Sequence, residues 1–297
     1  MLRIELCNGQ LFTNLVDMRK HTGGLARDLE VIEALSSAES FTQGGLGVAR
    51  VAEITGRDRG QVSRVLRTLA ESGMVDRDPK SRKFSLGHHF YALAMRTREA
   101  HLALQSESRL AELVAQVQET AHLNVLRGGR VLTIKTVVAA DAVRRSGWDG
   151  VTTGAGRTAS GRVMLAGLTN NEIELWWNEH ALDDPMPMVG DDLPEPPEPI
   201  NPKTSKQARQ PAKSLKAFLK QLQQVRDQGF AISEDFQPGI IDAAAPVRDA
   251  SNVVVAAISV GTTRERIGDQ TEPFGQLVSA AGLRLSMDLG APIVGPA

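Results

Sequence analysis

Hydrophobic residues between positions 48 and 69 recur at steps of three and four, which is the spacing of two amphipathic helices. Gly56 lies between these helices and can adopt the left-handed conformation that ends a helix. Asp58 follows at a place that suits an N-cap residue, so we expect the second helix to begin directly after it. The residues expected to face inward are Val48, Val51, Ala52 and Ile54 in the first helix and Val62, Val65, Leu66 and Leu69 in the second.

Polar and basic residues remain for the outer face of the second helix and for the segment after it. Gly73 is expected to end the helix, and residues 74–86 predict a strand, a turn at Asp78-Pro79 and a second strand. A helix–turn–helix places its second helix in the major groove, where Arg and Gln bind base edges, and a basic wing reaches phosphate or the minor groove. The residues predicted to contact double-stranded DNA are Arg57, Arg59, Gln61, Ser63, Arg64, Arg67, Lys80, Arg82 and Lys83.

The distribution of charge supports a DNA-binding module. Residues 50–83 contain nine Lys or Arg against five Asp or Glu, whereas the whole chain of 297 residues has a formal net charge of -1. Positive charge is therefore concentrated where phosphate contact is expected. Arginines on a helix surface are often only solvated charges, but here the cap, the turn, the outer-face arginines and the basic ribbon coincide.

Beyond position 87 the pattern predicts a helical connector followed by an α/β domain. Polar and apolar residues alternate on both sides of Gly128-Gly129, which indicates a β-hairpin, and residues 249–252 are expected to join another pair of strands. Helices are expected over 108–121, 158–166, 214–229 and 274–289. The predicted organisation is an N-terminal arm at 1–25, a DNA-binding domain at 26–87 with its first helix at 26–40, a linker helix at 88–106, an effector-binding domain at 107–290 with a Pro-rich loop insertion at 183–214, and a tail at 291–297.

Composition narrows the class of protein. Hydrophobic residues make up 41% of the chain and aromatic residues 4%, so we expect sizeable aliphatic cores. The single cysteine, Cys7, excludes an internal disulfide framework and a Cys-based zinc site, and we expect neither metal nor cofactor. No apolar run approaches membrane-spanning length, and the start of the chain lacks the organisation of a signal peptide, so a cytoplasmic protein is expected.

Five segments, in order along the chain, resemble the IclR family of bacterial transcriptional regulators. They are TGRDRGQVSRVLRTLAESGMVDRDP, FSLG, TASGRVMLAGL, VRDQGFAISEDFQPGIIDAAAPVRD and VVAAISVG, and the resemblance covers residues 26–290. It implies an α+β fold with an N-terminal winged helix–turn–helix, a linker helix and a C-terminal GAF-like α/β effector-binding domain. It also implies dimers, often paired into tetramers, and a small metabolite that changes operator affinity. Arg64 falls on the recurrent recognition-helix Arg of the family.

The resemblance implies a ligand pocket in the C-terminal domain. Ala159 and Ser160 fall at the start of the signature helix, Asp242 and Ser259 fall on polar pocket positions of two strands, and Gly261 stands where some members have Ser. The chain also departs from the family. Arg162 replaces the signature Lys, Gly154 and Gly156 replace Pro and His in the preceding loop, and Asp242 stands where a small Ser or Cys is common.

The chemistry of these residues suggests what the ligand carries. A helix start favours an anion, but an ionised Asp242 would repel one, so we hypothesise a ligand with an amide, hydroxyl or amine donor. Trp148, in a Gly-rich loop, can cover such a ligand or can simply anchor the loop, and Asp242 can equally make a structural hydrogen bond to backbone. The predicted effector-binding residues are Trp148, Ala159, Ser160, Asp242, Ser259 and Gly261.

The function predicted is that of a ligand-responsive transcriptional regulator, with repression of a catabolic or metabolic operon as the default. A symmetric oligomer is expected to read two half-sites about one helical turn, or a multiple of it, apart. Two alternatives stay open. The first is an enzyme that turns over a small metabolite and carries an accessory N-terminal module, although no nucleophile–base pair can be placed together from the sequence. The second is a DNA-binding scaffold with an empty effector domain.

Overall fold

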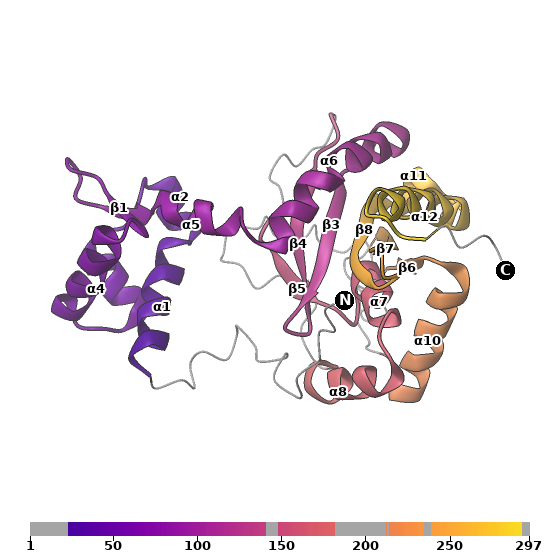
Figure 1. The fold of residues 1–297 in the computed structure, drawn as a ribbon, viewed down its shortest axis with the longest axis horizontal. Coiled ribbons are helices and arrows are strands. Elements are labelled where there is room, and N and C mark those ends of the chain that lie inside the picture. Colours follow the sequence, from indigo (N-terminus) through magenta and orange to yellow (C-terminus); the bar gives the residue numbers. More distant parts are fainter. Residues whose placement is uncertain (1–22, 141–147, 182–211, 213, 235–238, 293–297) are drawn as a thin grey trace. The chain divides into compact units, whose positions relative to one another are not determined.

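The computed structural model describes residues 23–140, 148–181, 212, 214–234 and 239–292. They form two compact units, of which the first ends at His101 and the second begins at Leu102 (Figure 1). The expected N-terminal arm and Pro-rich insertion lie almost entirely outside the described residues, as does most of the C-terminal tail.

The first unit consists of short helices and a two-stranded antiparallel ribbon. Its elements are α1 (Gly24–Leu35), α2 (Ala38–Thr42), α3 (Val48–Thr55), α4 (Arg59–Glu71), β1 (Val75–Arg77), β2 (Phe84–Leu86) and α5 (His88–Ala94). Its core is formed by apolar residues from α1, α3, α4 and the ribbon. Leu46 and Phe84 exchange two backbone hydrogen bonds of 2.8 Å each, which attach the loop before α3 to the ribbon.

The predicted helix–turn–helix is confirmed. Gly56 has φ of 65° at the end of α3, and the Asp58 side chain accepts hydrogen bonds from the backbone N–H groups of Gly60 and Gln61 at the start of α4. Ile54 was predicted to face inward and is instead 44% exposed. The buried residues of α3 are Val51 and Ala52, and Ile54 lies beyond the edge of the helix face that they form.

Two predicted helices are each divided in the structure. The helix expected at 26–40 ends at Leu35, because the side chain of Ser37 accepts the backbone N–H of Ser40 and starts α2. The linker helix expected at 88–106 is also wrong as one helix. α5 ends at Ala94, and α6 (Arg98–Val117) begins after Thr97, whose hydroxyl accepts the backbone N–H of Ala100.

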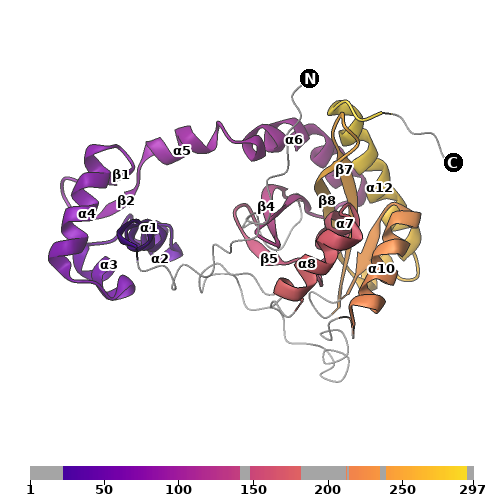
Figure 2. The ribbon, with the colours of Figure 1, turned by 60° about the horizontal axis from the view of Figure 1, so that its bottom comes forward.

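The second unit is built on an antiparallel sheet with helices beside it (Figure 2). The sheet has six strands in the order β5-β4-β3-β8-β7-β6. The strands are β3 (Ala121–Arg127), β4 (Arg130–Val137), β5 (Thr152–Gly154), β6 (Ala231–Ser233), β7 (Ile240–Arg248) and β8 (Val254–Thr263). Both predicted hairpins are confirmed. Gly128 and Gly129 have φ of 53° and 74°, and Asp249 accepts the backbone N–H groups of Ser251 and Val253 in the turn between β7 and β8.

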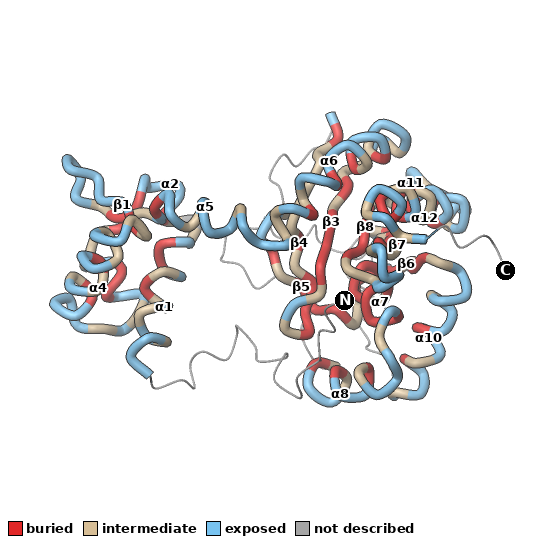
Figure 3. The backbone as a smooth tube through the Cα atoms, in the orientation of Figure 1, coloured by how far each residue is buried: buried red, intermediate tan, exposed pale blue. Residues whose placement is uncertain are grey.

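Helices cover both faces of this sheet. The remaining helices are α7 (Ala159–Ala166), α8 (Asn170–His180), α10 (Leu215–Gln228), α11 (Arg264–Ile267) and α12 (Thr271–Asp288). α6 and α12 pack on one face, where alternate residues of β3, β7 and β8 form the main core. α7 packs against β7 and β8, and both α7 and β3 are largely buried (Figure 3). In the described part of the chain, every helix is too short or too polar to cross a membrane.

The sequence analysis missed α8, although a local signal was present. Thr169 and Glu172 form a capping box, in which each side chain binds the backbone N–H of the other residue. Trp176 and Ile173 on α8 are buried, and the Trp176 indole donates a 2.7 Å hydrogen bond to the carbonyl oxygen of Gly129. α8 therefore supports the β3–β4 hairpin.

We predict that Asp58→Ala lowers the free energy of opening of α4 by about 1 kcal/mol, because it removes the acceptor for two N–H groups at the helix start. Native-state hydrogen exchange of the α4 amides measures this quantity. Asp58→Asn is the matched control, since Asn caps about as well as Asp. Equal destabilisation by the two variants would contradict the capping role.

Candidate functional site

The outer face of α4 presents basic side chains to solvent. Arg59, Arg64 and Arg67 are exposed, as is Gln61, whereas Ser63 is half-buried. The side chains of these three arginines make no hydrogen bond or ion pair with any residue that the structure describes. On the opposite side of the helix, Val62 and Leu66 are fully buried in the core. α4 is thus held by its apolar face, and its guanidinium groups are available to a partner.

Arg57 differs from the other predicted DNA-contacting arginines. Its guanidinium forms a 3.0 Å ion pair with Asp28 and donates a 2.6 Å hydrogen bond to the carbonyl oxygen of Arg27. Only 14% of its side chain is exposed. Arg57 therefore joins the turn before α4 to α1 and does not belong to the exposed face.

The tip of the ribbon is ordered by one carboxylate. Asp78 accepts hydrogen bonds from the backbone N–H groups of Lys80 and Ser81 and from the Ser81 hydroxyl, and the bonds from Ser81 hold the pKa of Asp78 below its usual value. Arg82 has a left-handed φ of 58°, which is uncommon outside glycine. The side chains of Lys80 and Arg82 are exposed, but the Lys83 ammonium donates a 2.9 Å hydrogen bond to the carbonyl oxygen of Gln43.

In the second unit, most of the predicted effector residues lie around the face of the sheet that α6 and α12 do not cover. Alternate residues of a strand share a face. In the register, His122 on β3 lies opposite Ser259 on β8, and Ser259 lies opposite Ala244 on β7. Asp242 and Gly261, two residues along β7 and β8, are also opposite each other. These five residues therefore share one face.

Two hydrogen-bonded clusters line this face. In the first, Asn124 donates to the Ser259 hydroxyl at 2.9 Å and accepts from the Thr133 hydroxyl at 2.9 Å. In the second, the Nδ1 atom of His122 lies 3.1 Å from the Thr136 hydroxyl, which also accepts the backbone N–H of Trp148 at 3.2 Å.

The aromatic rings of the second cluster lie close together. The rings of His122 and Trp148 meet edge to face, with centroids 6.3 Å apart. Burial lowers the pKa of His122 to about 4, so its imidazole is neutral at neutral pH.

Asp242 binds the start of α7. Its Oδ2 atom accepts the backbone N–H of Ala159 at 3.1 Å, which is the structural hydrogen bond that the sequence left open. Burial raises the pKa of Asp242 to about 7, although the Ala159 N–H and the charge of Arg162 act in the opposite direction. Ala159 and Ser160 are themselves buried. The start of α7, which was expected to favour an anion, is therefore occupied by the carboxyl group of Asp242.

His122 and Asp242 are half-buried, as are Thr136, Trp148 and Gly261. Solvent therefore reaches part of this face, although Ala244 and Ser259 on the same face are buried. The half-buried residues lie on β3, β4, β7, β8 and the loop before β5, and this part of the face is named the recess.

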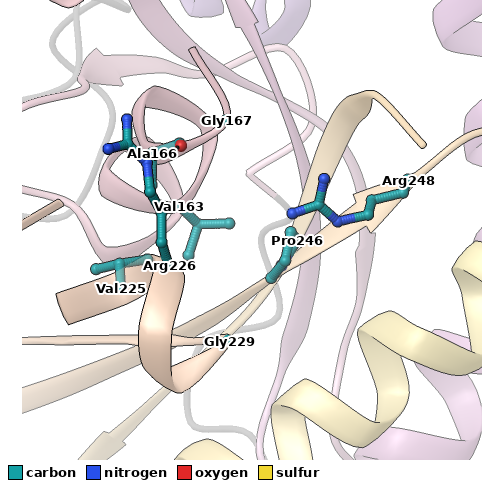
Figure 4. Close-up of a pocket in the computed structure, with 8 residues that line it drawn as sticks. All are labelled: Val163, Ala166, Gly167, Val225, Arg226, Gly229, Pro246 and Arg248. Carbon is teal, nitrogen blue, oxygen red and sulfur yellow. Dashed lines mark hydrogen bonds between the residues drawn. The ribbon is translucent and has the colours of Figure 1, made fainter. Parts of the chain in front are cut away.

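A hollow lies at the end of α7 that is remote from Asp242, where α7, α10 and β7 meet (Figure 4). Arg226 closes the end of α7 by donating to the carbonyl oxygens of Ala166 and Leu168. None of the predicted effector residues lines this hollow, whose walls are Val163, Ala166, Gly167, Val225, Arg226, Gly229, Pro246 and Arg248.

The sequence analysis missed four residues of the recess region, namely His122, Asn124, Thr133 and Thr136. A signal was present in β3, where polar His122 and Asn124 alternate with apolar Ala121, Leu123 and Val125. In a strand this alternation places the polar residues on one face. It did not show which of the two faces would be covered by α6 and α12.

Comparison with known proteins covers both units. The family model "IclR helix-turn-helix domain" matches residues 24–79, and the model "Bacterial transcriptional regulator IclR C-terminal" matches residues 95–187 and 202–287. The chain is 25% identical over 274 residues to the HTH-type transcriptional regulator XynR of Escherichia coli, covering 90% of this chain and 96% of that one. It is 26% identical over 275 residues to the glycerol operon regulatory protein of Streptomyces griseus, covering 90% and 99%.

Solved structures share the fold. An IclR homolog from Microbacterium hydrocarbonoxydans, crystallised in complex with 4-hydroxybenzoate, superposes with a TM-score of 0.69 at 18% identity and covers 89% of this chain and 98% of that one. The structure of an IclR transcriptional regulator from Alicyclobacillus acidocaldarius gives a TM-score of 0.65 at 24% identity, covering 90% and 98%.

We predict that Asp242→Asn flattens the dependence of stability on pH. A carboxyl pKa raised by folding means that the folded state holds its proton more tightly, so this contribution to stability falls as pH rises from about 4 to about 7. Asn removes the titration and can still accept the Ala159 N–H. One pKa unit corresponds to about 1.4 kcal/mol, so the mutant should gain on the order of a few kcal/mol relative to wild type across this window.

Urea denaturation at pH 4.5 and pH 7.5 measures the effect as a difference between the two proteins. Because His122 titrates in both proteins, its contribution cancels in that difference. Parallel pH profiles for wild type and mutant would show that Asp242 has an ordinary pKa.

Proposed function

The chain belongs to the IclR family of bacterial transcriptional regulators, and on that premise we propose that α4 reads a DNA operator while the recess of the second unit binds the small molecule that regulates this binding. The observation that carries the DNA-binding part is the exposed face of α4, whose arginines have no partner among the described residues. Arg59, Gln61, Arg64 and Arg67 are the residues proposed to enter the major groove, where Arg binds guanine and Gln binds adenine.

The ribbon is proposed to contact the DNA backbone or the minor groove beside this site. Lys80 and Arg82 carry the charge, and the bonds to Asp78 hold the tip in one conformation before DNA arrives. Lys83 and Arg57 have structural partners, so we assign them positioning roles. Ser63 is half-buried on α4, and we propose that it contributes less to DNA binding than the exposed residues.

The recess of the second unit is proposed as the effector site. Support comes from half-buried polar groups gathered on one face of the sheet and from a fold relative that was crystallised with 4-hydroxybenzoate. The residues proposed to line it are Trp148, Asp242, Ser259 and Gly261 with His122 and Thr136, while Ala159 and Ser160 form the start of the helix behind them.

The regulated genes are proposed to form a catabolic or metabolic operon, and the Streptomyces griseus relative is named as the regulatory protein of a glycerol operon. We further propose that the regulator acts in the cytoplasm as a symmetric homodimer or homotetramer, with repression as the default. Two copies of α4 would then read two half-sites spaced by one helical turn or a multiple of it. The effector must bind the DNA-competent and DNA-incompetent arrangements with different affinities to switch them.

We predict that Arg64→Ala weakens specific operator binding by about 1–3 kcal/mol, the usual contribution of one arginine bound to a base. The probe is a duplex selected from random sequence by the wild-type protein, and the measurement is a gel-shift titration. Arg50→Ala is the matched control, because Arg50 lies in the same unit but is held by Glu39 and Glu53. Wild-type affinity in Arg64→Ala would refute the role of this residue.

We predict that Lys80→Ala weakens binding to all duplex sequences alike and reduces the slope of log K against log salt by about 1, because one phosphate contact is lost. Lys83→Ala should change the slope less, since the Lys83 ammonium is bound to the Gln43 carbonyl oxygen. Affinities for the selected duplex and for a scrambled duplex, measured over a range of salt concentrations, test this. An unchanged slope in Lys80→Ala would remove the ribbon tip from the interface.

A further inference from the structure

The hollow where α7, α10 and β7 meet combines apolar walls with two arginines (Figure 4). Val163 and Ala166 of α7 are buried there, and Val225 of α10 and Pro246 of β7 are half-buried. None of the described residues that line the hollow is acidic. Its volume is about 260 Å³, counting the space that is open to solvent.

Arg248 lines this hollow and keeps one edge of its guanidinium group without a partner. Its Nη1 atom donates a 3.0 Å hydrogen bond to the carbonyl oxygen of Asn252, but its Nε and Nη2 atoms bind no residue in the described ranges. Arg248 is half-buried, and neither of these two nitrogens is completely buried. Figure 4 shows the side chain extending from the end of β7 toward α7. The free edge is therefore accessible to a molecule in the hollow.

The same edge binds pairs of oxygen atoms at two other arginines of this unit. Arg109 donates from Nε and Nη2 to the two carboxylate oxygens of Asp288, at 2.6 and 3.0 Å. Arg226 donates from the same two atoms to the carbonyl oxygens of Ala166 and Leu168, at 2.7 and 3.0 Å. Two parallel N–H groups match the two oxygens of a carboxylate. Arg248 thus presents a carboxylate-binding edge that no described carboxylate occupies.

The charge of Arg248 is not matched by the acidic residue next to it. The carboxylate of Asp249 accepts the backbone N–H groups of Ser251 and Val253, so it is committed to the turn between β7 and β8. Arg226 adds a second positive charge to the lining, although its guanidinium is directed at the end of α7. The hollow therefore favours an anion over a neutral or cationic molecule.

The apolar walls and the volume restrict the rest of the ligand. A volume of 260 Å³ is below the range of about 300–1,000 Å³ for drug-sized ligands. An inorganic anion would place some of its oxygens against Val163 and Val225, where they would lose water and find no donor. A short hydrocarbon chain is stabilised by the same walls.

We propose that this hollow binds a short-chain organic carboxylate, with the carboxylate on the Nε–Nη2 edge of Arg248 and the hydrocarbon part against Val163, Val225 and Pro246. This site is separate from the recess proposed for the effector, so the inference goes beyond the regulatory function proposed above.

Thermal-shift titrations of the full-length protein with butyrate, butyramide and inorganic phosphate test the ligand class. Sodium chloride keeps the ionic strength equal in all titrations, because salt by itself changes electrostatic interactions. A ligand of the folded state raises the melting temperature with concentration, which gives its affinity. Butyrate is expected to bind about tenfold or more tightly than butyramide, which lacks the charge, and more tightly than phosphate, which lacks the hydrocarbon part.

Two substitutions test the place of binding. Arg248→Gln removes the paired donors and keeps an N–H group for the carbonyl oxygen of Asn252, while Val225→Met fills the hollow and leaves its charges unchanged. Each should weaken butyrate binding about tenfold or more. Arg284→Gln is the matched control and should bind butyrate like wild type. Arg284 is also a half-buried arginine of this unit whose side chain binds no described residue, but it lies on α12.

Each result decides one part of the proposal. Equal affinities for butyrate and butyramide would overturn the role of the carboxylate, and phosphate binding as tight as that of butyrate would overturn the role of the hydrocarbon part. Unchanged butyrate affinity in either variant that folds would overturn the hollow as the site. If Arg248→Gln does not fold, Val225→Met and the order of ligands in wild type still decide. No stabilisation by butyrate would overturn the site and leave the proposals for DNA and effector binding in place.

Discussion

The alternation of side chains along β3, β7 and β8 commits one face of the six-stranded sheet to the core under α6 and α12 and places several polar side chains on the other face, part of which α7 covers. Residues such as Leu123, Ala245 and Ile258 pack under α6 and α12, and their neighbours in sequence must then point the other way. His122, Asn124, Asp242 and Ser259 stand at those neighbouring positions. A shift of one residue in the register would exchange the two faces, so the same burial that stabilises the unit also fixes the polar recess in place.

The same division of faces organises the DNA-binding unit. Val62 and Leu66 anchor α4 in the core, and the helix period then turns Arg59, Arg64 and Arg67 outward. The neighbouring basic residues are not equivalent. Arg57 and Lys83 have side-chain partners within the unit and hold the turn and the ribbon in position, whereas the side chains of Arg64 and Lys80 bind none of the residues that the structure describes. Charge counted along the sequence therefore overstates the number of groups that are free to bind phosphate or bases.

Asp242 shows how a side chain of the sheet can satisfy the start of a helix that packs on it. A helix start attracts anions, and in this chain the anion that it attracts is already present on β7. The carboxyl group loses solvent on burial, which raises its pKa to about 7. The contact that joins the sheet to the helix therefore involves a group that titrates near neutral pH.

The sequence by itself determined the helix–turn–helix, the two hairpins and the ends of α3, α4, α7 and α10 to within a residue or so, because caps, glycines and hydrophobic periods act over a few residues. Gly56 and Asp58 are examples. The sequence did not predict contacts between residues that are far apart along the chain. Only the tertiary structure paired Arg57 with Asp28, placed His122 beside Trp148 and brought Asp242 to the N–H of Ala159, 83 positions away in the chain. Such contacts depend on how strands and helices pack, and local pattern carries no information about which faces meet.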